Sequence, residues 1–452
     1  MSLEKLRGIN EEGKQEKVKN DGLTHLGTGV DMNDISRQID IAIKDVDRSG
    51  HFGCFGTTRV GKTRLIENII EQDIRKGYNV VVIDPKGDHD LFSKIVQVAA
   101  ESGRLEEVML LTPIFPEYSI MLDPLCYYYM EDELVEHIIS GIKAKEDYFI
   151  AIAQEVSQAI VSGLALLARF NMEKLNINFQ DIKSRSDWKS LQKFKEKIGF
   201  ISGSEDIVEN LDQILSSPQE FFGKVSSSLR TTLSALTSGS TGQIIGKALV
   251  NEFIKRFEEG KGLILFCNTG SMLARRTSHI IGRVLVSMIH SLSGRFYASD
   301  RKLDPPLCLH VDEGHNILYK GIQELFGKGG GANVWVSFYT QSISQIEEEI
   351  GPEATKSIVD NINSWLYLRV NHPDTAQLVE DSSPLKKTYQ PILSFGGGIS
   401  MRGLEEKQIL ASQVLQLPQR RFYLRAGGKL YKGTTDTVSK KYLSVTLPEI
   451  NS

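Results

Sequence analysis

One eight-residue stretch constrains this chain more than any other part of it: Gly56-Thr-Thr-Arg-Val-Gly-Lys-Thr63. It follows a short apolar run, His51–Phe55, and opens a run from Lys62 to Lys76 whose apolar residues repeat at helical spacing. A Gly-x4-Gly-Lys-Thr pattern between a strand and a helix is typical of a phosphate-binding P-loop, because glycines let backbone N–H groups and the helix N-terminus approach an anion. This context disfavours a chance match, so the sequence predicts a nucleoside triphosphate site.

The residue types in this loop suggest individual roles. Lys62 would reach the β- and γ-phosphates, and the hydroxyl of Thr63 would ligate Mg²⁺. ATP and Mg²⁺ are therefore the expected cofactors. The residues expected to contact the nucleotide are Gly56, Thr57, Thr58, Arg59, Val60, Gly61, Lys62, Thr63 and Arg64.

A second signal lies in residues 307–313, an apolar run that ends in the adjacent carboxylates Asp312 and Glu313. At the carboxyl end of a strand, Asp312 would hold the Mg²⁺ shell and Glu313 would polarise the attacking water. Gln341 follows the next expected strand, where its amide would sense the γ-phosphate or orient water. The alternatives are a solvated acidic pair and a strand-capping glutamine. With Lys62, Glu313 and Gln341 are the expected catalytic residues, and the acidic pair favours hydrolysis over phosphoryl transfer to a second substrate.

Strand-like and helical runs alternate on both sides of a long helical stretch. Residues 79–84 and 262–268 are continuous apolar runs of the kind found in strands that are buried on both faces of a parallel sheet. Between about residues 131 and 238 we find no strand-like run, only successive helical periodicities. The pattern predicts an α/β fold, a RecA-like doubly wound parallel sheet of a P-loop NTPase domain with an inserted all-α domain.

The expected domain division has four parts. Residues 1–26 would form a flexible, lysine- and glutamate-rich N-terminal arm. Residues 27–130 would form the first part of the nucleotide-binding domain, residues 131–240 the all-helical inserted domain, and residues 241–452 the second part of the nucleotide-binding domain. At the start of the first part, residues 27–49 are expected to form an amphipathic helix.

Composition and cysteine usage indicate a soluble, reducing environment. The chain is 24% charged and 40% hydrophobic, as in ordinary globular proteins. The cysteines Cys54, Cys126, Cys267 and Cys308 are far apart and show no metal-ligand pairing, so free, mostly buried thiols are expected. We find no stretch of 18 or more apolar residues and no signal-peptide core at the start, which predicts a cytoplasmic chain; the polar arm would also fit a truncation just after a membrane anchor.

The charge distribution gives only local hints of a nucleic-acid contact. The net charge of −4 carries no global basic signature, although a basic channel can be locally concentrated. Three basic pairs are candidates: Arg275-Arg276 after an expected strand, Lys386-Lys387 in an expected loop, and Arg420-Arg421 before an expected β-hairpin. Each pair is alternatively a solvated surface patch.

These motifs together resemble a known family. The P-loop, Asp84-Pro-Lys-Gly-Asp88, Asp312-Glu313 and Thr340-Gln341-Ser342 are similar to motifs of the FtsK/HerA superfamily of DNA-pumping ATPases, and most of all to those of TraD/TraG-type coupling proteins of conjugative transfer. The Ile-Asp-Pro-Lys-Gly-Asp run is the most specific element. The resemblance covers roughly residues 45–430, and a helical domain interrupting the nucleotide domain is that family's architecture. Asp84 and Asp88 would approach the nucleotide or a neighbouring subunit, or would only shape a turn.

The resemblance implies a ring-forming, hexameric ATPase that moves single-stranded DNA toward a type IV secretion channel. ATP would lie between subunits, and the helical domain would face the cytoplasm and the relaxosome with its relaxase. Members of the family begin with transmembrane helices, so the chain would act at the cytoplasmic face of the inner membrane if an anchor has been removed. They also carry a trans-acting arginine before the glutamine strand, where this chain offers Lys328.

Two other functions remain open from the sequence. One is a packaging or repair motor of the same superfamily that acts on duplex DNA. The other is a nucleotide-gated docking scaffold that binds ATP and recruits secretion substrates without pumping. Asp312-Glu313 argues against a pure scaffold, whereas the missing arginine permits weak hydrolysis.

Overall fold

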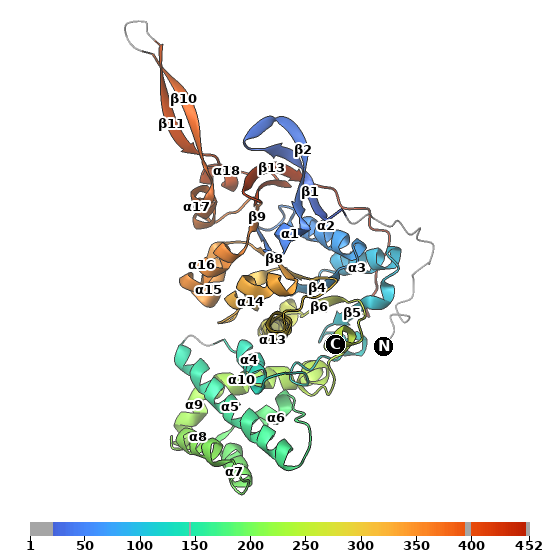
Figure 1. The fold of residues 1–452 in the computed structure, drawn as a ribbon, viewed down its shortest axis with the longest axis vertical. Coiled ribbons are helices and arrows are strands. Elements are labelled where there is room, and N and C mark those ends of the chain that lie inside the picture. The colour runs from blue at the N-terminus through green and yellow to red at the C-terminus, as the bar shows by residue number, and fades with distance from the viewer. Residues whose placement is uncertain (1–20, 144–145, 394–398, 449–452) are drawn as a thin grey trace.

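The computed structural model describes residues 21–143, 146–393 and 399–448, which form one large sheet, a separate hairpin and a helical region (Figure 1). The large sheet has eleven strands in the order β2-β1-β13-β12-β9-β3-β8-β7-β4-β6-β5. The strands are β1 (Leu23–Asp31), β2 (Asp34–Lys44), β3 (Phe52–Phe55), β4 (Asn79–Asp84), β5 (Val108–Leu111), β6 (Ile264–Asn268), β7 (Leu307–Val311), β8 (Val334–Thr340), β9 (Ser364–Tyr367), β12 (Arg421–Ala426) and β13 (Lys429–Thr435) in this sheet, and β10 (Leu385–Leu393) and β11 (Ile399–Lys407) in the hairpin.

The seven strands from β9 to β5 in this order are parallel, and β12, β13, β1 and β2 extend the sheet with antiparallel pairs. Every residue of β3, β4, β6, β7 and β8 is buried, as expected for parallel strands covered on both faces. The predicted fold class is confirmed, with the refinement that the sheet is mixed at one end.

Helices cover both faces of the parallel strands. Because successive side chains of a strand point to opposite faces, Val80 and Val82 of β4 pack in the core under α2 (Lys62–Arg75) and α3 (His89–Glu101). Val81 and Ile83 pack in the other core, under the long helix α13. The remaining elements of this part are α1 (Asp45–Arg48), η2 (Leu105–Glu107), η3 (Pro116–Tyr118), α13 (Ser271–Ala298), η5 (Gly314–Ile317), α14 (Gln323–Lys328), η6 (Gly329–Ala332), α15 (Ile343–Ile350), α16 (Pro352–Asn361), α17 (Pro373–Ser382) and α18 (Ala411–Leu415).

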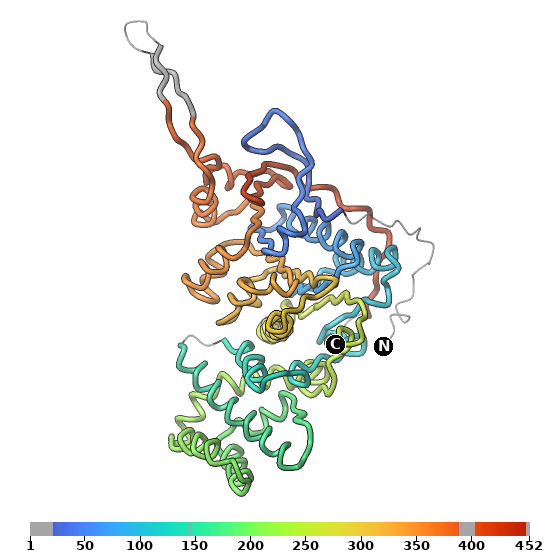
Figure 2. Tube along the Cα trace, in the orientation of Figure 1, coloured from blue at the N-terminus to red at the C-terminus, as the bar shows by residue number. Residues whose placement is uncertain are grey.

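The helical region lies between β5 and β6 in the sequence. In Figures 1 and 2 it is at the bottom, and α13 lies between it and the sheet. Its elements are α4 (Glu131–Ser140), α5 (Asp147–Phe170), α6 (Phe179–Lys183), α7 (Trp188–Ile198), α8 (Glu205–Leu215), α9 (Gln219–Val225), α10 (Ser227–Thr237), α11 (Gly239–Thr241), the π-helix η4 (Gly242–Gly246) and α12 (Glu252–Glu258). Among the described residues, α5 is the one helix long and apolar enough to cross a membrane, judged by length and composition alone. Here 44% of its apolar window is buried, against α4, α7 and α8 among others.

Two neighbouring segments connect the helical region to the sheet, and they pair at Leu122 and Asn251. The side-chain amide of Asn251 donates to the backbone carbonyl of Asp123 (3.0 Å). The Asp123 carboxyl is itself fully buried: Oδ1 accepts from the N–H of Leu125 (2.9 Å), and Oδ2 has no hydrogen-bond partner among the described residues. Burial raises the pKa of Asp123 to about 8, so this carboxyl is mostly protonated at neutral pH.

The substitution Asp123→Asn should therefore reduce the pH dependence of stability. The pKa of Asp123 rises from 3.8 to about 8 on folding, so the folded state binds more protons in this interval. The free energy of unfolding consequently falls as pH rises from about 4 to about 8 and levels off above. Asparagine does not titrate, so the variant should melt about 3 °C or more above the wild type at pH 8.5 and lose this advantage toward pH 4.

Thermal unfolding between pH 4 and pH 9, followed by circular dichroism, measures this difference. The matched control is Asp206→Asn, at an exposed carboxyl on α8, whose melting profile should follow that of the wild type. Parallel profiles for the wild type and Asp123→Asn would contradict the prediction.

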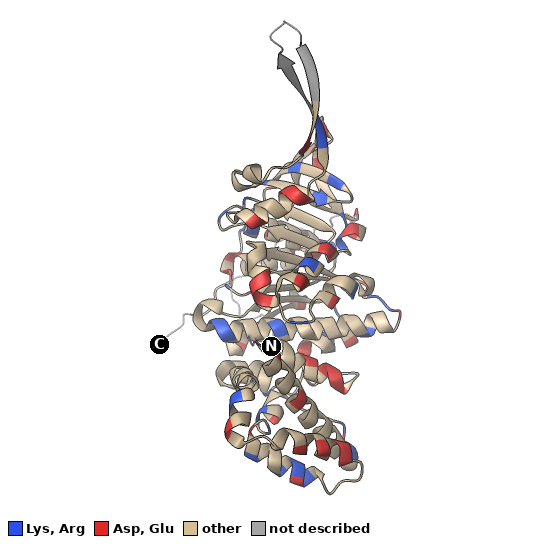
Figure 3. Ribbon diagram, turned by 90° about the vertical axis from the view of Figure 1, so that its left-hand side faces the viewer, with Lys and Arg blue, Asp and Glu red and all other residues tan. Residues whose placement is uncertain are grey.

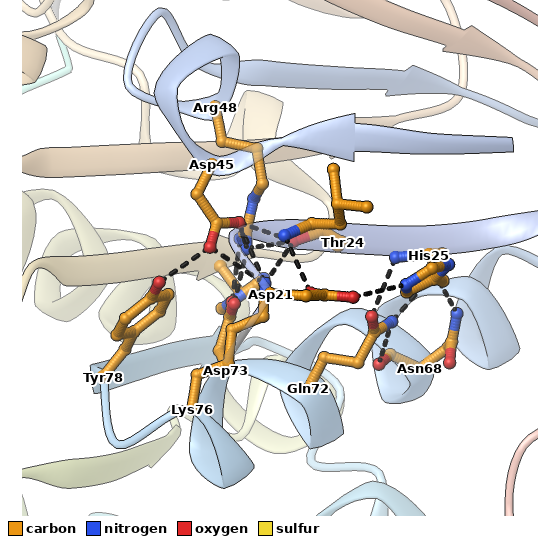
Figure 4. Close-up of polar contacts among 12 residues, drawn as sticks. Asp21, Thr24, His25, Asp45, Arg48, Asn68, Gln72, Asp73, Lys76 and Tyr78 are labelled. Carbon is orange, nitrogen blue, oxygen red and sulfur yellow. Dashed lines mark hydrogen bonds and ion pairs between the residues drawn. The ribbon is translucent and has the colours of Figure 1, made fainter. Parts of the chain in front are cut away.

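A buried charge cluster fixes the N-terminal strands against the P-loop helix (Figure 4). Arg48 of α1 donates two hydrogen bonds to the carboxylate of Asp73 on α2 (2.5 and 2.8 Å), and both side chains are buried. Asp73 also lies 2.9 Å from Nε2 of His310 on β7. The bidentate geometry offsets the cost of burying both charges, whereas removing one partner of such a pair costs about 3–5 kcal/mol. The cluster thereby fixes α2 relative to the strand that precedes the candidate catalytic carboxylates.

The structure corrects two local predictions. Residues 27–49 form the β1–β2 hairpin and α1 instead of an amphipathic helix; Ile39, Ile41 and Ile43 recur every second residue, which is the period of a strand. The pair Lys386-Lys387 lies in β10, paired with β11, and not in a loop.

β1 begins within the predicted N-terminal arm, residues 1–26, at Leu23. Residues 1–20 of that arm lie outside the described residues. The division of the chain into four parts, drawn from the sequence, stays a prediction.

Candidate nucleotide site

The P-loop runs from the end of β3 to the start of α2, at the carboxyl edge of the parallel strands. Its backbone is held from both sides: the N–H of Gly56 donates to the carbonyl of Thr340 at the end of β8 (3.0 Å), and the N–H of Thr57 donates to that of Arg369, just after β9 (2.9 Å). Gly61 has φ 110°, a conformation that favours glycine, and occupies the N-cap of α2. The loop is therefore shaped by its neighbours and by its own glycine.

Lys62 provides a test of whether these residues fit a bound nucleotide. Its side chain is only 7% exposed, and Nζ lies 3.7 Å from Oδ1 of Asp312 and 3.8 Å from Oε1 of Glu313. The ammonium group has no hydrogen-bond partner among the described residues. A buried cation with unused donors is unfavourable unless an anion completes its shell. A triphosphate with Mg²⁺ supplies that chemistry, so the residues present fit it.

Asp312 and Glu313 follow β7 directly. Adjacent residues of a regular strand point to opposite faces, but Glu313 adopts a left-handed conformation (φ 47°, ψ 49°) that breaks the strand. The backbone there is anchored, because the N–H of Asp312 donates to the carbonyl of Ile83 (3.0 Å) and the N–H of Glu313 donates to Oδ1 of Asp312 (2.9 Å). As a result, both carboxylates lie within 4 Å of Lys62.

Three groups contact or closely approach the carboxylate of Glu313. Nε2 of Gln341 donates to both oxygens (3.1 and 3.2 Å), Nζ of Lys86 contacts Oε1, and Nζ of Lys62 lies 3.8 Å away. Burial alone would raise the pKa of Glu313, but the two lysines and the Gln341 hydrogen bond outweigh it, and the pKa is lowered. The carboxylate is therefore ionised at neutral pH, as a group that polarises water requires.

The turn Asp84–Asp88 follows β4 and carries Lys86. The Asp84 carboxylate accepts from the N–H groups of Lys86 (2.9 Å) and Asp88 (2.5 Å), and Asp88 caps the start of α3. Burial, with a contribution from nearby Asp312, raises the pKa of Asp84 to about 6. The contacts of both aspartates are those of turn formation. In this structure Lys86, rather than either aspartate, contacts Glu313.

The other predicted nucleotide residues occupy different environments. Thr58 and Arg59 are exposed at the tip of the loop, and Thr63 is partly exposed on the first turn of α2. Arg64 is exposed and pairs with Glu67 of its own helix (2.6 Å). The structure thus brings Lys62, Asp312, Glu313 and Gln341 together, while Arg64 points to a partner outside this group. The assigned roles stay predictions.

Two neighbours of Glu313 were not assigned to the site from the sequence. Lys86 lies 227 residues away in the chain. His315 places Nδ1 3.9 Å from Oε2 of Glu313, and this buried nitrogen has no hydrogen bond within the part of the chain that the structure describes. Lys86 lies within the Asp84–Asp88 motif named from the sequence, and His315 lies two residues after Glu313, but neither was given a role there. Lys328, the expected substitute for a trans-acting arginine, is exposed at the end of α14 and pairs with Glu324 of the same helix.

Comparisons with known proteins match both parts of this site. The family model described as "Helicase HerA, central domain" matches residues 24–223, which include the P-loop and the Asp84–Asp88 turn. The family model described as "TraM recognition site of TraD and TraG" matches residues 306–381, which include Asp312, Glu313 and Gln341. No curated protein matches the chain.

Several solved structures share the fold over almost the whole chain. The "bacterial conjugative coupling protein TrwBdeltaN70" is 16% identical with a TM-score of 0.67, covering 99% of this chain and 94% of that one. The "plasmid coupling protein TrwB" with a non-hydrolysable ATP analogue is 15% identical with the same TM-score and coverage. VirB4 of Thermoanaerobacter pseudethanolicus is 11% identical with a TM-score of 0.52, covering 93% and 98%. At these identities the likeness shows the fold.

Proposed function

We propose that this chain, a P-loop ATPase similar to the TraD/TraG-type coupling proteins of the FtsK/HerA superfamily, hydrolyses ATP to move single-stranded DNA in conjugative transfer. The observation that carries the hydrolytic part is the position of Glu313: an ionised carboxylate, oriented by Gln341, within 4 Å of the P-loop lysine. The conjugative part is supported by the family description that names TraD and TraG, and by the conjugative coupling protein among the structural neighbours.

In the proposed mechanism each residue has one task. Lys62 and the backbone N–H groups of residues 58–63 bind the phosphates of ATP, since the N–H groups of Gly56 and Thr57 are used within the sheet. Thr63 and Asp312 would hold Mg²⁺, which supplies charge neutralisation at the phosphates when bound. Glu313 accepts a proton from the attacking water, and Gln341 keeps the carboxylate aimed by donating to both of its oxygens.

The proposed partners follow from the same likeness. The chain would assemble as a homohexamer with ATP between subunits, so that a neighbouring subunit covers the exposed loop residues Thr58 and Arg59. It would receive DNA from the relaxosome and its relaxase and pass it to a type IV secretion channel. Its place would be the cytoplasm, or the cytoplasmic face of the inner membrane where a membrane anchor is present.

Steady-state ATPase measurements with and without DNA test this proposal. We expect single-stranded oligonucleotides to raise ATP turnover at least about fivefold, because the binding of one ligand typically changes the properties of a second, coupled site by at least this factor. The titration should span protein concentrations, because a site shared between subunits becomes active only on assembly. Stimulation by duplex DNA alone would favour a packaging or repair motor, and no stimulation at any protein concentration would favour a docking scaffold.

A further inference from the structure

A small basic and apolar surface lies at the start of α13; we call Met272, Leu273, Arg275 and Arg276 the α13 patch. Met272 is 84% exposed and Leu273 is 67% exposed, and both arginines are exposed. Within the described residues, neither arginine has a hydrogen bond or an ion pair. The patch therefore presents unpaired positive charge next to apolar side chains that no part of the described chain covers.

The α13 patch lies on the same edge of the sheet as the candidate catalytic residues. α13 begins just after β6 ends, and β6 is separated from β7 by β4 alone. Neighbouring strands lie about 4.8 Å apart, so the ends of β6 and β7 are about 10 Å apart. A non-helical residue, Ala274 (φ −144°, ψ 70°), separates the turn that carries Met272 and Leu273 from the rest of α13.

A direct connection joins the patch to Glu313. The N–H of Ser271 donates to the carbonyl of Pro85 (2.7 Å), in the turn that carries Lys86. The same turn packs tightly on the end of β6, because a Cβ atom on Gly87 would lie 2.4 Å from Oδ1 of Asn268. Lys86, between Pro85 and Gly87, reaches the Glu313 carboxylate. A shift of the patch would therefore displace the lysine that holds the water-polarising residue.

We propose that the α13 patch binds single-stranded DNA and that Lys86 couples this binding to Glu313, an inference that rests on the proposed function. Unpaired guanidinium groups bind backbone phosphates without regard to sequence. Exposed apolar side chains pack against or between unstacked bases, which single strands offer and an intact duplex does not. Acidic and basic residues are interspersed in the view of Figure 3, which shows no large basic face. A contact through a few arginines and apolar side chains does not require one.

The binding test uses the full chain, a fluorescently labelled oligo(dT) and anisotropy at 50–300 mM NaCl. Arg275→Gln with Arg276→Gln should weaken binding at least about tenfold at low salt. It should also make the slope of log affinity against log salt shallower by about 1.4, because each phosphate contact to a single strand contributes about 0.7. Met272→Ser with Leu273→Ser should weaken binding without changing this slope.

The matched control replaces two exposed lysines of α7 that have no ion pair with any described residue, Lys189→Gln with Lys193→Gln, and should bind as the wild type does. Thermal melting confirms that each variant is folded. If the arginine variant keeps the wild-type slope, or the control loses as much affinity, the assignment of the patch is wrong while the proposed function stands. If the wild type itself binds no DNA, the proposed function fails. If the arginine variant changes only the oligomeric state in sedimentation, the patch is an interface between copies and the proposal is overturned.

The coupling is tested by Lys86→Met, a change at a half-exposed side chain. This variant should keep wild-type affinity for oligo(dT) but lose most of the stimulation of ATP turnover by DNA. Stimulation by the same factor as in the wild type would show that Lys86 does not transmit binding at the patch.

Discussion

Replacement of Glu313 by glutamine should lower ATP turnover about 100-fold or more while leaving nucleotide binding within a few-fold of the wild type. Glutamine has nearly the shape of glutamate and can still accept a hydrogen bond from Gln341, but it cannot take a proton from water. General-base catalysis by one side chain typically contributes 10²–10⁴ in rate, which sets the size of the loss. The lysines around the site bind phosphate independently of this carboxylate, so affinity should largely remain.

The measurement pairs steady-state turnover with a separate binding assay, using a fluorescent ATP analogue. Glu324→Gln is the matched control, because Glu324 is an exposed acidic residue on α14 with its own lysine partner. Turnover of that variant should stay within twofold of the wild type. Wild-type turnover in Glu313→Gln would show that another group polarises the water.

The sequence predicted the parallel centre of the sheet because its strands are continuous apolar runs. β4 and β7 each bury every residue, and such runs can be read without knowing their neighbours. The antiparallel strands at the other end of the sheet were harder to predict from the sequence. In β2 the isoleucines at 39, 41 and 43 alternate with Asp40 and Ala42, but most of the strand is exposed, and aspartates weaken its apolar pattern. The likeness to TraD/TraG-type proteins, predicted from four short motifs, is confirmed by the two family models.

The site residues that belong to a local sequence motif could be predicted, whereas those that depend on tertiary contacts could not. The P-loop and the Asp312-Glu313 pair have fixed spacings that a sequence reveals. The left-handed backbone of Glu313 and its contact with Lys86, 227 residues distant, arise only when β4 and β7 pair in the sheet. The same holds for the connection from Ser271 to Pro85, which no periodicity would suggest.

Replacement of Lys62 by alanine should abolish the stabilisation of the protein by ATP with Mg²⁺. A ligand present at 100 times its dissociation constant stabilises the folded state by about 2.7 kcal/mol, so the wild type should show a clear rise in melting temperature. Lys62 is the buried cation whose donors have no partner in the described chain, and its loss removes the main attraction for the phosphates. We expect affinity to fall at least about 100-fold, the equivalent of one charge-assisted contact in a buried site.

The same variant carries a second, independent readout. The charge of Lys62 is the largest single effect that lowers the pKa of Glu313 against burial, so its removal should raise that pKa. A carboxylate whose folded pKa is lowered stabilises the protein above its unfolded value, and this contribution is lost as pH falls through the folded pKa. Lys62→Ala should therefore lose stability at a higher pH than the wild type on acidification. Lys44→Ala, at an exposed lysine on β2, is the control for both assays and should behave as the wild type. An undiminished thermal shift with ATP in Lys62→Ala would mean that the nucleotide binds elsewhere, since no other P-loop group can replace a buried ammonium opposite two carboxylates.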